Sequence, residues 1–80
     1  MSRRYFYHLT DGTCLVLDRK GRWTRSRSDL RRRAISAAGR LMEGAPASVT
    51  WSDWLVSVHD QNGSMVAVVP FPDAIAAKGA

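Results

Sequence analysis

The apolar positions at the start of the chain follow a strand-like pattern. Residues 4–9 are rich in aromatic side chains and predict a β-strand. The Asp11-Gly12 dipeptide that follows favours a hairpin turn, because such turns need a positive φ. We expect the return strand at residues 14–17, where the apolar run indicates that both faces are covered or that one meets a partner. Polar and basic residues 19–28 then predict a loop with room for a short edge strand at residues 22–24.

The hydrophobic period changes to that of a helix after Ser28, whose hydroxyl is a good N-cap. At about 100° per residue, the apolar residues that follow fall on one stripe and the polar residues on the opposite side. Gly44 and Pro46 are typical of the end of a helix. The predicted apolar stripe comprises Leu30, Ala34, Ala37, Ala38 and Leu41, flanked by Ile35 and Met42. The predicted polar side comprises Arg32, Arg33, Ser36, Arg40 and Glu43.

The second half of the chain predicts another hairpin. Residues 54–59 alternate between two faces, as expected of a strand in a half-covered sheet. Asn62-Gly63 is a strong signal for a tight turn. The last strand is predicted at residues 65–69, and Pro70 and Pro72 end it because proline cannot donate to a strand ladder.

The predicted order is β-β-α-β-β, which indicates an α+β fold with an antiparallel sheet of about four strands and one helix packed on one face. We expect a single domain over residues 1–80, with an ordered core at about residues 3–73 and a frayed tail at residues 74–80. The other face of such a sheet is open to water or to a partner. The side chains expected on that open face are Phe6, His8, Leu55, Ser57, His59, Val66 and Val68.

Several of these segments together resemble a family of short bacterial domains of unknown function. The resemblance rests on Arg4-Tyr5-Phe6-Tyr7-His8-Leu9 before Asp11-Gly12, an Asp18-to-Gly21 turn, an alanine-rich helix, Asp60 to Gly63, and Val69-Pro70-Phe71. It covers roughly residues 3–73 and implies an architecture similar to the one predicted above. It implies no activity, cofactor or site residue. The chain departs from the family in the segment after the second strand, which is usually acidic or mixed there and is basic here.

Positive charge is concentrated in one segment of the chain. The 80 residues carry a formal net charge of +5. Residues 19–33 hold eight basic side chains against Asp29 alone, a net +7, so the rest of the chain carries −2. Such asymmetry is typical of a protein that binds a polyanion. Arginine outnumbers lysine in this segment, and its planar fork suits bidentate contacts with phosphate.

The charge pattern indicates a non-enzymatic interaction module that binds an anionic partner, either nucleic-acid backbone or an acidic protein, through the basic loop and the helix start. An anion there meets free N–H groups of the first helical turn, and an aromatic ring can stack on a base. The predicted contact residues are Arg19, Lys20, Arg22, Trp23, Arg25, Arg27, Arg31, Arg32 and Arg33. Two alternatives stay open: the basic segment is only a solvated surface, or the open sheet face binds a protein partner.

Neither a catalytic set nor a metal site is predicted. His8 and His59 are expected on the open face, and Ser57 lies two residues from His59, but a Ser-His pair also needs an orienting group and an oxyanion hole. Cys14 is predicted to be a small buried hydrophobe. Neither a zinc-ligand spacing nor a glycine-rich phosphate loop occurs, so we expect no enzyme and no cofactor.

The size of the chain predicts self-association. A core of this size is small, and domains of such length often need a partner subunit, so a homodimer is expected. The sequence contains neither a signal-peptide pattern nor an apolar run long enough to span a bilayer. Together with a single cysteine, these features predict a cytoplasmic protein without membrane contact.

Overall fold

The computed structural model describes the backbone of residues 3–79 and the side chains of residues 3–76. The elements are β1 (Arg3–Thr10), β2 (Leu15–Val16), β3 (Arg22–Thr24), α1 (Arg27–Glu43), β4 (Leu55–Asp60), β5 (Met65–Pro70) and α2 (Phe71–Gly79). The sheet is antiparallel, with the order β2-β1-β4-β5 and with β3 also paired to β1. This arrangement confirms the predicted α+β fold, including the short strand at residues 22–24.

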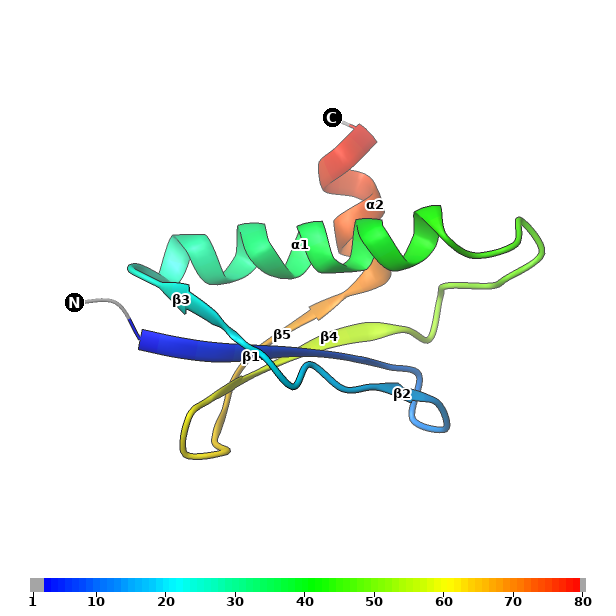
Figure 1. Ribbon diagram of the computed structural model, residues 1–80. Coiled ribbons are helices and arrows are strands. Elements are labelled where there is room, and N and C mark those ends of the chain that lie inside the picture. Colours follow the sequence, from blue (N-terminus) through cyan, green and yellow to red (C-terminus); the bar gives the residue numbers. More distant parts are fainter. Residues whose placement is uncertain (1–2, 80) are drawn as a thin grey trace.

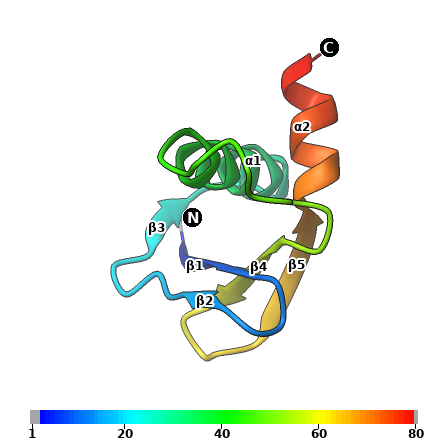
Figure 2. The ribbon, with the colours of Figure 1, turned by 90° about the vertical axis from the view of Figure 1, so that its right-hand side faces the viewer.

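Both helices lie on the same side of the sheet. In Figure 1, α1 runs across one face of the sheet, and α2 rises beside it from the end of β5. Figure 2, turned by 90°, shows α1 end-on above β1 and β4, with α2 above β5. The helices contact each other, and α1 also contacts β1, β4 and β5. The sheet therefore has one covered face and one open face within the described part of the chain.

The covered face holds the core, and α1 meets it through the predicted apolar stripe. Leu30, Ala34 and Ala38 are buried, because their spacing places them on one side of the helix. Ile35, Ala37, Leu41 and Met42 pack against the core at its edges. The sheet contributes Tyr7, Leu9, Val56, Val58 and Val69 to the same cluster. The small alanines let the helix lie close to these strands.

The predicted N-cap, Ser28, is wrong. The helix begins at Arg27, and the N-cap position is Ser26, whose φ of −142° and ψ of 162° are extended. The Ser26 hydroxyl lies 3.0 Å from the Ser28 hydroxyl and caps no backbone N–H. Two serines so close in the chain are equivalent as candidates, and the pattern alone cannot separate them. The predicted end of the helix at Gly44 is confirmed, and its N–H donates to the Arg40 carbonyl.

The return strand is shorter and more exposed than predicted. Only Leu15 and Val16 pair with β1, opposite Thr10 and Leu9, before the chain bends away. Leu15, Val16 and Leu17 are about half exposed, and Cys14 is exposed as well. The predicted burial of Cys14 and the covering of both faces of this strand are therefore wrong. The physical reason is that β2 lies at the edge of the sheet, where no described element packs over its outer side.

A second helix, which was not predicted from the sequence, covers most of the segment that was expected to form the tail. Residues 71–79 form α2, and Phe71 and Ala74 are fully buried. The Phe71 ring lies 5.4 Å from that of Trp51 and 5.8 Å from that of Trp54, and its N–H donates to the Trp54 carbonyl at 2.9 Å. Pro72 falls in the first turn of the helix, where its missing N–H costs nothing. Ala80 lies outside the described residues.

The composition of the open face is confirmed. The register places His8 opposite Ser57 and Phe6 opposite His59, which brings alternate residues of β1 and β4 to the face away from the helices. Phe6, His8, Leu55, Ser57 and His59 are half-buried there, and Val66 and Val68 on β5 are exposed.

Candidate functional site

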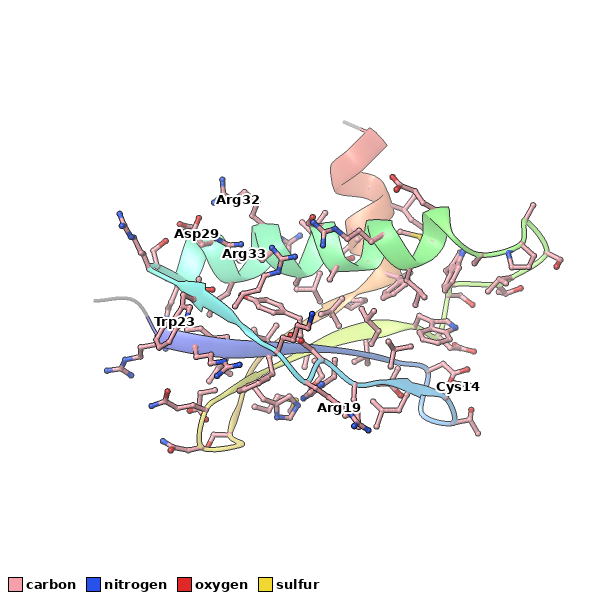
Figure 3. All side chains as sticks on the ribbon, viewed as in Figure 1. Cys14, Arg19, Trp23, Asp29, Arg32 and Arg33 are labelled. Atoms are coloured by element: carbon pink, nitrogen blue, oxygen red, sulfur yellow. The ribbon has the colours of Figure 1, made fainter. Side chains whose placement is uncertain are left out.

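The predicted basic residues do not form one continuous strip. Figure 3 shows Arg32 on the side of α1 away from the sheet and Arg33 on the side toward it, whereas Arg19 lies below β1. Arg32 donates to the Asp29 carboxylate at 2.6 Å, so its charge is engaged within the domain. The remaining exposed members of the predicted set are Arg19, Lys20, Arg22, Trp23, Arg25, Arg27 and Arg31.

Two members of the set, Arg22 and Arg33, face a common groove. The groove has a volume of about 380 Å³ and lies between α1 and the segment that runs from β2 to β3. A third arginine, Arg40, lines it as well. Asp18 is the single carboxylate among its described lining residues. We therefore take this groove, and not the helix start, as the candidate site.

One side of α1 forms a wall of the groove. Its residues Arg33, Ser36, Ala37, Arg40 and Leu41 follow the spacing i, i+3, i+4, i+7 and i+8, which keeps them on a single stripe. This stripe borders the buried one: Ser36 and Arg40 are exposed, as predicted for the polar side of the helix, whereas Arg33 is half-buried. Over seven residues the helix rises roughly 10 Å, which separates the two arginines along the groove.

Arg33 is the most constrained cation of the site. It is half-buried, and its Nε is buried and has no hydrogen-bond partner among the described residues. Nearby, the Tyr7 hydroxyl lies 3.0 Å from the Thr24 hydroxyl. Burial raises the pKa of Tyr7 above its ordinary value, against the hydrogen bond with Thr24 and the positive charges of Arg33 and Arg22. The positive charges of both guanidinium groups thus influence the Tyr7 hydroxyl, which lines the groove with them.

The opposite wall depends on Asp18, which fills a gap along the edge of β1. Its carboxylate accepts hydrogen bonds from the N–H groups of Tyr7 at 3.1 Å, Lys20 at 3.1 Å and Gly21 at 3.0 Å. Burial alone would raise the pKa of Asp18, but these hydrogen bonds outweigh it and lower the pKa. The carboxylate is therefore engaged with the backbone, and it holds the β2–β3 segment in place.

Gly21 allows this segment to approach β1 closely. Its φ is +69°, a conformation that glycine adopts without strain. A Cβ there would lie 2.9 Å from the Tyr5 carbonyl oxygen and 3.0 Å from the Phe6 ring. The close approach is reinforced by Arg4, whose Nε donates to the Lys20 carbonyl at 2.7 Å. The wall of the groove is thus built by a turn that tolerates only glycine at this position.

The two histidines meet on the open face, as the register predicts. Their ring centroids are 5.1 Å apart. His8 Nδ1 accepts from the Asp18 N–H at 3.0 Å. His59 Nδ1 lies 3.3 Å from the Gly63 carbonyl, which can only accept, so His59 Nε2 is the atom that accepts from the Ser57 hydroxyl at 2.6 Å. Burial, followed by the charge of His59, lowers the pKa of His8, while Asp18 opposes this effect.

The described residues form neither a metal-binding cluster nor a membrane-spanning helix. Over residues 3–79, no three side chains of the histidine, cysteine, aspartate or glutamate type lie together in a way that could hold a metal ion. No helix in that range combines the length and apolar character needed to cross a membrane.

Sequence reasoning missed several residues of the groove. Arg40 is predicted only as part of the polar side of the helix, and Tyr7 only as part of the first strand. The signal that was available is the spacing of Arg33 and Arg40, which places both on one helical stripe. The sequence indicates a turn from Asp18 to Gly21, but the contact of Asp18 with Tyr7 could not be predicted because that hydrogen bond spans eleven residues of chain.

Comparison with known proteins gives a family but no activity. Neither the curated proteins nor the solved structures gave a match to the chain. A family described as a domain of unknown function, DUF6894, matches residues 4–72, which include β1 from its second residue onward, the other four strands, α1 and the whole groove. By this match over most of its length, the chain belongs to the DUF6894 family of domains of unknown function.

Proposed function

We propose that the domain is a non-enzymatic binding module that holds an anionic partner in the groove between α1 and the β2–β3 segment. The observation that carries this proposal is Arg33. Its Nε is buried and lacks a partner among the described residues, beside Arg22 and the Tyr7 hydroxyl. A buried charged donor without an acceptor is costly, and a bound anion removes that cost.

Phosphate is the anionic group that fits this setting best. Arginine forks pair with phosphate oxygens bidentately. A phosphate monoester carries more charge than a carboxylate and offers three acceptor oxygens, and a phosphodiester chain repeats a full negative charge along its length; either suits a site lined by Arg22, Arg33 and Arg40. The partner we favour therefore presents phosphate, as nucleic-acid backbone does, and is not an acidic protein.

Binding of this kind needs no chemistry from the protein. The Nδ1 atom of His8 and both ring nitrogens of His59 already have hydrogen-bond partners in the domain, so these side chains serve the fold. Contacts with phosphate fix position and not sequence, so we expect little base preference.

Titration of the domain with a long oligothymidylate tests the proposal. Three arginine–phosphate contacts predict that the logarithm of the binding constant falls with the logarithm of salt concentration with a slope of about −2. Arg33→Gln should weaken binding roughly tenfold and reduce the slope by about 0.7. Arg31→Gln removes the same charge from an exposed position outside the groove, and it should change binding far less.

Two results would contradict the proposal. One is a lack of binding at low salt, which removes the anionic partner altogether. The other is an equal loss in the two variants, which means that overall charge and not the groove attracts the oligonucleotide.

The open sheet face supports a second candidate function, the binding of a protein partner or a second copy of the chain. Val66 and Val68 are exposed on β5, which is the free edge of the sheet, together with Met65. Exposed apolar side chains on an edge strand are typical of surfaces that pair with another chain. This surface lies opposite the helices, so it and the groove can be told apart by mapping a ligand onto the protein.

A further inference from the structure

The groove has two chemically different parts. In one part, Arg22 and Arg33 line the groove together with Tyr7, whose hydroxyl lies 3.0 Å from that of Thr24. Along the rest of the groove the lining is largely apolar. The apolar residues are Leu9, Val16, Leu17, Ala37 and Leu41. The groove therefore offers an apolar surface between its cations.

The apolar part is accessible to a ligand. Val16 is 43 % exposed and Leu17 is 52 % exposed, although both line the groove. Leaving such side chains in water has a cost that a ligand with an apolar body would remove. Ala37 leaves room on the facing wall, since its side chain is a single methyl group.

The size of the groove also fits a small molecule. Its volume of about 380 Å³ falls within the range typical of small-molecule sites, which begins at roughly 300 Å³. Such sites combine a mostly apolar lining with a few polar groups that orient the ligand. Arg22, Arg33 and Arg40 are those groups here.

We infer that the groove takes a small organic phosphate, with its phosphate at Arg22 and Arg33 and an apolar or aromatic body against Leu17 and its apolar neighbours. This inference rests on the proposed function and narrows it, from an anionic partner in general to a ligand of about the size of a mononucleotide. Arg40, roughly two helical turns from Arg33, reaches the far end of the ligand body.

Calorimetric titration with AMP, adenosine and inorganic phosphate tests this inference on the full chain. AMP should bind at least about tenfold more tightly than either of its parts, because it uses both ends of the groove. Arg33→Gln should weaken AMP and inorganic phosphate by roughly tenfold each. Leu17→Ser should weaken AMP about tenfold and leave inorganic phosphate unchanged, since it alters only the apolar wall.

The variants and the outcomes separate this inference from the proposed function. Leu17 is about half exposed, so its replacement should leave the thermal unfolding midpoint close to that of the wild type. Arg31→Gln, outside the groove, is the control for loss of charge. If inorganic phosphate binds as tightly as AMP, or if Leu17→Ser has no effect on AMP, the small-ligand inference is overturned. If oligothymidylate binds and AMP does not, the inference fails while the proposed function stands; if neither binds, both fail.

Discussion

The two faces of the sheet are stabilised by different interactions. On the covered face, Val56, Val58 and Phe71 are fully buried between the strands and the two helices. On the open face, His8 and His59 are half-buried and reach hydrogen-bond partners within the sheet and its loops. Packing of apolar side chains stabilises the covered face, and hydrogen bonds within the sheet and its loops stabilise the open face. The groove lies at the edge of β1, between α1 and the β2–β3 segment.

This difference explains where a binding site can form. The covered face is filled largely by the core, and on the open face His8 Nδ1, the Ser57 hydroxyl and both ring nitrogens of His59 already have partners within the domain. At the margin, Arg33 and Arg40 of α1 line the groove opposite the β2–β3 segment, where Arg33 is half-buried and Arg40 is exposed. Arg33 therefore keeps a buried donor without a partner there. A site at such a margin can bind a ligand without disturbing the core.

The largest expected effect on stability comes from truncating a buried side chain on the covered face. Phe71→Ala removes a fully buried ring that contacts Trp51 and Trp54, and it should reduce the free energy of unfolding by about 4 kcal/mol. Val68→Ala, on the open face, is the counterpart and should change it by less than about 0.5 kcal/mol. Urea unfolding of both variants measures the difference. Equal losses would mean that the open face is covered in solution, by a second copy or another partner.

A smaller effect on stability is expected from His8 on the open face, and this effect depends on pH. The folded protein lowers the pKa of His8, so below about pH 6.5 the unfolded chain binds this proton more readily than the folded one. Stability from this source is fully present above that pH and is lost as the pH falls through the pKa of the folded state. Urea unfolding between about pH 8 and about pH 5 should show the decline.

His8→Asn is the control for this pH dependence. The asparagine carbonyl can accept from the Asp18 N–H in place of Nδ1 but does not titrate. The decline in stability near pH 6 should therefore be absent in this variant. The lowered pKa of Asp18 adds its own loss only at a more acidic pH, below about 3.9. A decline of the same size in His8→Asn would assign the effect to another group.

Periodicity was enough to predict most of the fold. The two strand hairpins and the helix stripe at Leu30, Ala34 and Ala38 follow from local pattern, since each element is longer than one turn or pleat. The burial of Phe71 is different, because the rings that cover it come from the connector before β4. Pro72 and Asp73 are typical of a helix start, but the packing of Phe71 against those rings is a long-range contact that local pattern does not show.

The site could be predicted only in part. Arg22 and Arg33 belong to the basic segment that the charge pattern indicates, whereas the structure separates them from the rest of that segment. The groove itself joins β1, the loop around Asp18 and the middle of α1, and these segments are brought together by the fold. Charge along the chain therefore indicates the kind of partner, and the register and helix packing decide which arginines meet it.

Mapping a bound anion onto the protein by amide chemical shifts tests the central claim most directly. The domain would be titrated with oligothymidylate and followed by nuclear magnetic resonance. We predict that the largest shifts occur at groove residues such as Leu17, Ser36 and Ala37, with Ser57 and Val68 on the open face unchanged. Shifts that gather on the open face, or along the outer side of α1 around Arg32, would contradict the assignment of the groove as the anion site.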